Sequence, residues 1–286
     1  TGHTGLTALL GSPVAHSISP LMHNESFRLL GLDYVYLCFD VNEETLPAAV
    51  AGLKTCGIRG FNLTMPNKNK IVELLDELSP EAQLIGAVNT VLNDNGKLIG
   101  YNTDGYGFMQ SVRDAGHDIT GKNITVMGVG GASMAICAQS ALDGAASVHI
   151  FARRTSRYWN RTQKFAENLS AKTGCQVCLF DNDDHTALRD SIAQSYLLIN
   201  ATSVGMVPDI DDTIIKDTSL FHPELVVADV VYEPQETRLL REAKAAGCQT
   251  FNGMYMLLHQ GAKAFQIWTG QEMPVSVIKE KYFSVK

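Results

Sequence analysis

A glycine-rich loop between a predicted strand and a predicted helix constrains the fold of this chain more than any other feature. Ile124–Met127 has the apolar character of a buried strand, and Ala132–Leu142 that of a packed helix. In the loop between them, Gly128 permits a tight turn and Gly130 lets the backbone approach a pyrophosphate. The helix N-terminus adds free N–H groups for an anion. We therefore predict an α/β unit that binds a dinucleotide.

Strands and helices alternate along both halves of the chain, which predicts an α/β fold. In the first half the predicted strands are Leu6–Leu10, Tyr34–Val41 and Gly60–Met65, and the helices Pro20–Leu30, Glu44–Cys56 and Asn67–Leu78. They are followed by a hairpin over Ala87–Leu92 and Lys97–Tyr101 and a helix over Tyr106–Ala115. The further strands of the second half are Ser147–Phe151, Gln176–Phe180, Tyr196–Asn200, Leu225–Val230 and Gln249–Phe251, and its further helices Trp159–Ala171, Leu188–Ala193 and Met254–Thr269.

The order of these elements predicts two domains. Residues 1–106 would form the first domain, around a small and mostly parallel sheet, and residues 107–251 a Rossmann-type domain. The C-terminal segment 252–286 would return its helices to the first domain.

Composition excludes several classes of function. A net charge of −7 leaves no basic surface for nucleic acid or an anionic membrane. No apolar run approaches the roughly 20 residues of a membrane helix, and the N-terminus lacks the features of a signal peptide, so we expect a cytoplasmic protein. The six cysteines and eight histidines have no metal-site spacing beyond a lone Cys175/Cys178 pair, so no metal is expected. Oligomeric state, monomer or homodimer, stays open.

A cluster of basic residues follows the second strand of the Rossmann-type unit, where the adenosine ribose binds in such folds. Arg153, Arg154 and Arg157 stand there with Thr155, and no acid follows until Glu167. A carboxylate would favour NAD, whereas guanidinium groups match a 2′-phosphate. NADP is therefore the expected cofactor, with NAD possible.

Polar side chains follow the predicted strands of the first half. Asn62, Thr64 and Lys68 surround Pro66, which ends the third strand, and the carboxyl ends of such strands are where ligands bind. Taken alone, this segment fits the start of a helix with a solvated lysine better than it fits a ligand site. Ser17 precedes Ser19, which is expected to cap the next helix before Pro20.

Two further positions call for an explanation. Asn89 is an amide in the middle of a predicted strand, where it is unfavourable. Asp104 lies between the hairpin and the next helix, where it could simply be an N-cap.

These motifs together resemble the shikimate dehydrogenase family in order and rough spacing, over nearly the whole chain. The motifs are Ser17–Pro20, Asn62–Lys68, Gly86–Thr90, Asn102–Gly105, the loop at Gly128, Asn200–Met206, Asp229–Pro234 and Leu258–Ala262. The segments Met65–Lys68 and Met256–Gly270 also resemble the quinate/shikimate dehydrogenase branch.

The resemblance implies an enzyme of aromatic amino acid biosynthesis that reversibly reduces 3-dehydroshikimate to shikimate with a nicotinamide cofactor. It implies that Lys68 and Asp104 are the catalytic pair. The implied substrate residues are Ser17, Ser19, Asn62, Thr64, Asn89, Tyr232 and Gln260. The implied cofactor residues are Gly128, Val129, Gly130, Gly131, Ala132, Ser133, Arg153, Arg154, Thr155, Arg157, Thr202, Ser203, Val231 and Gly253.

Three departures from the family pattern bear on the choice between NADP and NAD. Met134 stands where many members have arginine, Ser133 replaces the third glycine, and Arg153–Arg157 fits neither branch cleanly. Thr64 is similar to the shikimate-preferring members, whereas serine would suit the branch that also takes quinate.

Lys68 can stabilise and protonate the oxygen of a ketone that accepts a hydride, and either Lys68 or Asp104 could accept the proton in the reverse direction. Three alternatives remain: a quinate/shikimate dehydrogenase, a dehydrogenase of another cyclic acid or amino-sugar-like alcohol, and a dinucleotide-binding sensor without catalysis.

Overall fold

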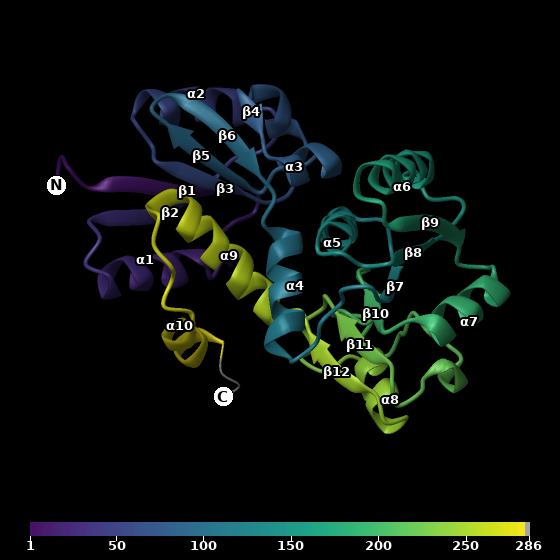
Figure 1. Ribbon diagram of the computed structural model, residues 1–286. Helices are drawn as coiled ribbons and strands as arrows, with labels where there is room; N and C mark the ends of the chain where they lie inside the picture. The colour runs from purple at the N-terminus through teal and green to yellow at the C-terminus, as the bar shows by residue number, and fades with distance from the viewer. Residues whose placement is uncertain (284–286) are drawn as a thin grey trace. The chain divides into compact units, whose positions relative to one another are not determined.

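The computed structural model describes residues 1–283, so the last three residues of the expected returning segment 252–286 lie outside the described residues. The chain divides into two compact units, each built on its own six-stranded sheet (Figure 1). Unit 1 comprises Thr1–Gly107 and Leu258–Lys286, and unit 2 comprises Phe108–Leu257. The expected two-domain α/β class is thereby confirmed.

The sheet of unit 1 is mixed. Its strands are β1 (Gly5–Gly11), β2 (Tyr34–Asp40), β3 (Gly60–Leu63), β4 (Glu77–Leu78), β5 (Thr90–Asp94) and β6 (Lys97–Tyr101), in the order β2-β1-β3-β5-β6-β4. The ladders β1/β2, β1/β3 and β4/β6 are parallel, whereas β5 pairs antiparallel with β3 and β6. The predicted hairpin is therefore present, and Asn95 and Gly96 form its turn with positive φ.

Helices cover both faces of this sheet. Its helices are α1 (Ser19–Leu29), α2 (Leu46–Thr55), the 3-10 helix Lys70–Leu74, α3 (Pro80–Ile85) and α10 (Val275–Tyr282), while α4 (Asp104–Asp114) and α9 (Met254–Thr269) each continue from one unit into the other. Because side chains alternate along a strand, Ala8 and Phe61 enter an apolar core that includes Leu46 and Val50 of α2. Tyr36 points to the other face, where it meets aromatic residues of α1 and α9.

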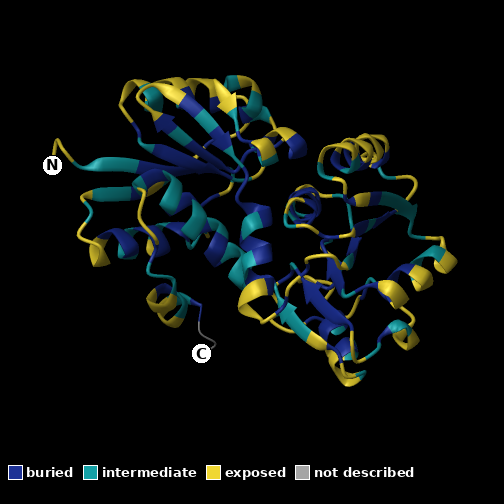
Figure 2. Ribbon diagram, viewed as in Figure 1, coloured by how far each residue is buried: buried dark blue, intermediate teal, exposed yellow. Residues whose placement is uncertain are grey.

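Unit 2 has the parallel sheet of a Rossmann-type fold. Its strands are β7 (Asn123–Met127), β8 (Ser147–Ala152), β9 (Gln176–Asp181), β10 (Leu197–Asn200), β11 (Val226–Asp229) and β12 (Gln249–Asn252), in the order β12-β11-β10-β7-β8-β9. Its helices are α5 (Gly131–Leu142), α6 (Trp159–Thr173), α7 (His185–Gln194), the 3-10 helix Thr218–Leu220 and α8 (Arg238–Ala245). The strands are mostly buried and the outer helix faces exposed (Figure 2), as expected for a sheet covered on both sides.

The strand order of unit 2 reverses at β7. The chain runs through β7, β8 and β9 in one direction, and β10, β11 and β12 then follow on the other side of β7. A reversal of this kind leaves a crevice at the carboxyl ends of the strands, which is where open α/β sheets bind nucleotides. The loop after β7 is the glycine-rich loop at Gly128.

Three local expectations were wrong. Residues 67–78 do not form one helix, because Asp76 and its neighbours turn away to pair with β6: Asp76 N donates to Leu98 O at 3.0 Å, and Leu98 N donates to Asp76 Oδ2 at 2.7 Å. Ser19 is not the N-cap of α1, since the helix already begins at Ser19 and Ile18 occupies the cap position. Asn89 lies just before β5 rather than in the middle of a strand.

Candidate functional site

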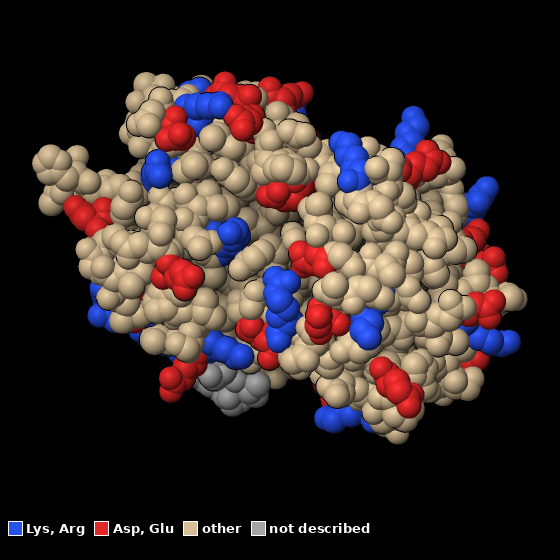
Figure 3. Space-filling view, in the orientation of Figure 1, with Lys and Arg blue, Asp and Glu red and all other residues tan. Residues whose placement is uncertain are grey.

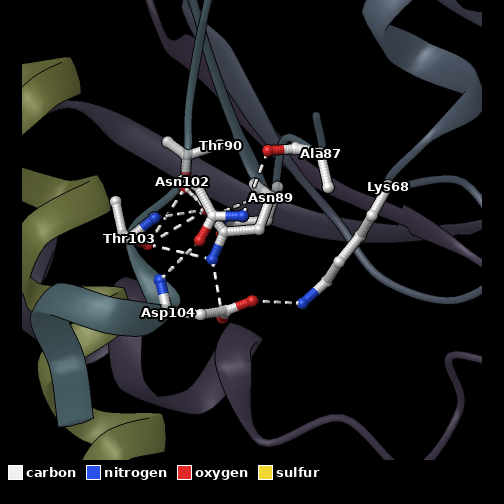
Figure 4. A network of polar contacts seen from close by, with 8 residues as sticks. Lys68, Ala87, Asn89, Thr90, Asn102, Thr103 and Asp104 are labelled. Atoms are coloured by element: carbon white, nitrogen blue, oxygen red, sulfur yellow. Dashed lines mark hydrogen bonds and ion pairs between the residues drawn. The ribbon is translucent and has the colours of Figure 1, made fainter. Parts of the chain in front are cut away.

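The expected catalytic pair is formed in unit 1. Lys68 Nζ lies 2.6 Å from Asp104 Oδ2, although the two residues are 36 positions apart in the sequence (Figure 4). Lys68 comes from the segment that follows β3, where Val88 N donates to the Lys68 carbonyl at 2.8 Å and ties this segment down. Asp104 is the first residue of α4. The lysine side chain is 30% exposed, so a ligand can reach its ammonium group.

Asp104 does not cap its own helix with its side chain. Asn102 takes that role instead, because Asn102 Oδ1 accepts from Asp104 N at 3.2 Å. Both carboxylate oxygens of Asp104 are therefore directed at other side chains: Oδ2 accepts from Lys68, and Oδ1 accepts from Asn89 Nδ2 at 2.8 Å. The carboxylate is held in one orientation.

The amide of Asn89 forms the centre of this network. Its Nδ2 donates to Asp104 Oδ1 and to Thr103 Oγ1, the latter at 3.0 Å, and its Oδ1 accepts from Thr103 N at 2.8 Å and Thr90 Oγ1 at 3.0 Å. Both amide hydrogens are thus used within the protein. Asn89 is 2% exposed. The arrangement favours a role for Asn89 in orienting Asp104. A direct contact between the Asn89 amide group and the substrate would require one of these hydrogen bonds to be shared.

Asn62 lies beside this network. Asn62 Nδ2 donates to Asn89 O at 3.1 Å and Thr90 Oγ1 at 2.9 Å, and Oδ1 accepts from the hydroxyl of Tyr36 at 2.8 Å. Tyr36 was not among the expected site residues, because an aromatic residue in a strand looks like ordinary packing. Thr90 and Thr103 lie within the motifs noted in the sequence, but no role was assigned to them.

Thr64 and the serines line the same end of the sheet. A Cβ on Gly11 would come within 2.2 Å of Thr64 Cγ2, so the threonine methyl packs directly on the glycine. Within the described chain the Thr64 hydroxyl has no hydrogen-bond partner, which leaves it available to a ligand. Ser17 Oγ accepts from Ser19 N at 3.2 Å in the turn that leads into α1.

The two remaining expected substrate residues lie elsewhere. Gln260 is on α9, in the part of that helix that belongs to unit 1. Tyr232 belongs to unit 2, in the turn after β11, where its side chain is 41% exposed. Partial burial raises the pKa of the Tyr232 phenol.

The loop at Gly128 has the geometry that a dinucleotide requires. Gly128 has φ +112°, and a Cβ there would lie 2.8 Å from Thr202 Cγ2. Gly130 is the N-cap of α5, so no side chain covers the first N–H groups of Gly131 and Ala132. A Cβ on Gly130 would meet open space, which leaves room for a pyrophosphate.

Ser133, in the first turn of α5, stabilises the loop with its side chain. It is fully buried, and its Oγ donates to the carbonyl of Gly128 at 2.6 Å. The small residue at the third glycine position therefore packs as expected and also holds the turn in place. Gly253 allows another close approach, since a Cβ there would lie 2.2 Å from Val230 O.

The three arginines after β8 differ in their surroundings. Arg154 stacks over the ring of Trp159 at 4.7 Å. Arg157 lies 4.7 Å over the ring of Tyr158 and donates to its hydroxyl at 2.6 Å. The exposed guanidinium of Arg153 has no partner among the described residues. Arg153 is thus the arginine most readily offered to a phosphate.

A buried hydrogen-bond network links two of the expected motifs, in the loops after β10 and β11. Asn200 Oδ1 accepts from Thr202 Oγ1 at 2.7 Å, and Asn200 Nδ2 donates to Asp229 Oδ1 at 3.0 Å. The same Asp229 oxygen accepts from Val231 N at 2.9 Å. Burial raises the pKa of the Asp229 carboxyl to about 6. Among the expected cofactor residues, Val231 is therefore held directly by the Asp229 carboxylate, and Thr202 is held through Asn200.

Other kinds of site find no support in the described part of the chain. Residues 1–283 contain no group of three or more metal-ligating side chains that could hold an ion. Basic and acidic side chains are interspersed on the face drawn in Figure 3. Among the described helices, none is long and apolar enough to cross a membrane.

Comparisons with known proteins identify the family of the chain. The family model described as the shikimate dehydrogenase substrate binding domain matches residues 9–91, and that of the shikimate 5'-dehydrogenase C-terminal domain matches residues 253–281. A protein named shikimate dehydrogenase (NADP(+)) from Listeria innocua is 52% identical over 283 residues, which cover 99% of this chain and 97% of that protein.

Solved structures show the same relationship. Shikimate 5-dehydrogenase from Listeria monocytogenes, in complex with shikimate and NAD, has a TM-score of 0.95 and 51% identity over 98% of this chain and 96% of that one. Quinate dehydrogenase from Corynebacterium glutamicum, in complex with NAD, has a TM-score of 0.86 and 31% identity over 99% of each chain. The chain belongs to the shikimate dehydrogenase family.

Proposed function

We propose that this protein is a shikimate dehydrogenase that interconverts 3-dehydroshikimate and shikimate with NADP. The observation that carries the proposal is the Lys68–Asp104 pair, oriented by Asn89, at the carboxyl end of β3. A sensor that only binds a dinucleotide has no need for such a proton-handling pair. Residues 1–106 with the returning segment 252–286 would form the substrate domain, and residues 107–251 the cofactor domain.

The pair provides what the reduction of a ketone needs. When bound, the nicotinamide supplies the hydride, and negative charge then develops on the ketone oxygen. The ammonium of Lys68 has three donors, of which Asp104 takes one, so the others can stabilise and protonate that oxygen. In the oxidation direction the hydroxyl proton passes to the same pair. Fixing Asp104 through Asn89 keeps Lys68 in place for both directions.

The residues of unit 2 fit a dinucleotide phosphate. The loop at Gly128 and the uncovered N-terminus of α5 suit the pyrophosphate, with Val129, Gly131 and Ala132 contributing backbone N–H groups. Arg153 would bind the 2′-phosphate of NADP, with Arg154, Thr155 and Arg157 beside it. Thr202, Ser203, Val231 and Gly253 would complete the site at the ends of β10, β11 and β12.

Different residues of the proposed substrate site would bind different groups of the substrate. Ser17, Ser19 and Thr64 offer hydroxyl groups that suit a carboxylate, and Asn62 an amide oxygen that suits a ring hydroxyl. Tyr232 and Gln260 are the further proposed substrate contacts. Thr64 would favour shikimate, because its methyl group packs against Gly11 and would take up space beside the substrate.

An assay of nicotinamide reduction that crosses shikimate and quinate with NADP and NAD tests the proposal. We expect the highest kcat/KM for shikimate with NADP. Turnover of quinate would favour the quinate/shikimate branch, whose candidacy rests on the similarity to a quinate dehydrogenase. The absence of turnover in every one of the four combinations would overturn the proposal. Thermal stabilisation by NADP alone, without turnover, would then identify a sensor.

A further inference from the structure

A tyrosine outside the expected site donates a hydrogen bond to a residue of the proposed substrate shell. We propose that Tyr36 of β2 is a positioning residue, whose hydroxyl presents Asn62 to the substrate as a hydrogen-bond acceptor. The inference rests on the proposed function, because it concerns the substrate of that same site. It also specifies the chemistry of one contact: Asn62 would receive a hydroxyl of the substrate and not its carboxylate.

The orientation of the Asn62 amide follows from its partners. A backbone carbonyl can only accept, so the amide nitrogen must face Asn89 O, at 3.1 Å. The second amide hydrogen goes to Thr90 Oγ1 at 2.9 Å. Both donors of Asn62 are therefore used inside the protein, and only Oδ1 remains.

Tyr36 completes this arrangement. Its hydroxyl donates to Asn62 Oδ1 at 2.8 Å, which occupies one of the two acceptor positions of that oxygen. The second acceptor position of Asn62 Oδ1 can be filled only by a hydrogen-bond donor of the ligand. A ring hydroxyl can donate, whereas an ionised carboxylate cannot and would be repelled.

The structure fixes Tyr36 on all sides. The residue is fully buried, and its ring stacks on His23 at 4.5 Å with an interplanar angle of 10°. Its backbone is held by the side chain of Asn24, which accepts from Tyr36 N at 2.8 Å and donates to Tyr36 O at 3.0 Å. Burial raises the pKa of the Tyr36 phenol well above its usual value, so the hydroxyl retains its proton and donates.

Loss of the Tyr36 hydroxyl would leave the Asn62 oxygen without its internal donor. The bonds between Asn89, Asp104 and Lys68 would stay intact.

Replacement of Tyr36 by phenylalanine tests the inference, with Tyr34→Phe as the matched control. Tyr34 lies on the same strand, and its ring stacks on Phe27 at 5.3 Å in the same aromatic cluster. We expect Tyr36→Phe to raise the KM for shikimate roughly tenfold, because the buried Asn62 amide loses the hydrogen bond that holds it in place. The kcat and the KM for NADP should stay within about twofold of wild type, because the catalytic pair is untouched. Tyr34→Phe should change none of the three.

A double-mutant cycle with Asn62→Ala shows whether Tyr36 acts through Asn62. Once Asn62 is alanine, Tyr36→Phe should raise the KM for shikimate no further. Additive effects, an unchanged KM in the single variant, or a Tyr36→Phe protein that no longer folds would overturn the inference. Wild-type protein without shikimate turnover would instead remove the proposed function and the inference with it.

Discussion

At the scale of single residues, most polar atoms of the site already have hydrogen-bond partners inside the protein, and few remain for a ligand. Asn89 and Asn62 use both of their amide hydrogens inside the protein, and both carboxylate oxygens of Asp104 are occupied. Among these residues and their neighbours, the groups left for a ligand include the remaining Lys68 hydrogens, the second acceptor position of Asn62 Oδ1 and the hydroxyl of Thr64. Most of the polar residues thus position the few that react.

Replacement of Lys68 by methionine, which keeps most of the length and removes the charge, should lower kcat by about 10²- to 10⁴-fold with little change in KM. The reason is that the ammonium acts mainly on the charge that develops in the transition state. Steady-state kinetics with shikimate and NADP measure the effect.

The companion variant Asp104→Asn should be strongly non-additive with Lys68→Met, because both act on one oxygen through their 2.6 Å contact. A Lys68→Met enzyme that retains most of its kcat would disprove the catalytic role. Lys70→Met is the control, since Lys70 pairs with Glu73 outside this network.

Replacement of Arg153 by alanine should raise the KM for NADP by about tenfold or more and leave the KM for NAD nearly unchanged, because a charge-assisted bond to the 2′-phosphate is lost. Arg157→Ala should have a smaller effect, since Arg157 is committed to Tyr158. Arg189, exposed on α7 of the same unit, provides the control. An equal rise of the KM for NADP and for NAD would show that Arg153 does not recognise the 2′-phosphate but supports folding or cofactor binding in general.

At the scale of elements, local patterns predicted those segments whose structure depends on their own sequence. The strands of unit 2, the β5–β6 hairpin and the helix after Gly128 lie where periodicity and turn residues placed them. Residues 67–78 were misassigned, because pairing of Asp76–Leu78 with β6 is a long-range choice that no local window contains. The helix α8 was overlooked although its signal was present: Thr237 caps it, and Leu239, Leu240 and Ala243 face inward.

The same distinction applies to the site. Lys68, Asp104 and the loop at Gly128 stand out by residue type in the sequence. Tyr36 acts only through partners brought to it by the fold, and a tyrosine in a strand carries no distinguishing mark in the sequence. Asp229 belongs to a motif that the sequence does show, but its bonds to Asn200 and Val231 depend on the fold.

Replacement of Gly128 by alanine should destabilise unit 2 by about 1–3 kcal/mol, because φ +112° is strained for an L-residue and the new Cβ would meet Thr202. Gly130→Ala is the matched variant: its φ of −78° is ordinary and its surroundings are open. It should keep the melting temperature and weaken cofactor binding. Thermal melts with and without NADP separate the two, and a Gly128→Ala protein with wild-type stability would contradict the expectation.

At the scale of the whole molecule, the burial of titratable groups makes the stability depend on pH. His23 is fully buried, neither ring nitrogen has a hydrogen-bond partner in the described chain, and burial lowers its pKa to about 3. The folded state therefore excludes a proton that the unfolded state binds below about pH 6.5. The stability connected with His23 is fully present above that pH and is lost as the pH falls toward 3.

From pH 7.5 to pH 5 this single group should lower the free energy of unfolding by about 2 kcal/mol. His23→Phe keeps a flat ring against Tyr36 and should reduce the pH dependence by that amount, measured by urea unfolding at both pH values. Other groups, such as Asp229, are common to both proteins and cancel in the comparison. His3→Gln, an exposed histidine, is the control, and an unchanged pH dependence in His23→Phe would refute the assignment.

The Asn24 clamp on Tyr36 has a consequence for encounters between copies of the protein. β2 is an edge strand, and a free edge invites another chain to extend the sheet. Asn24 occupies both the N–H and the C=O of Tyr36, so an incoming strand finds no partner in the middle of this edge. The side chain that holds the Tyr36 backbone should thus also disfavour the pairing of β2 with a strand of another copy.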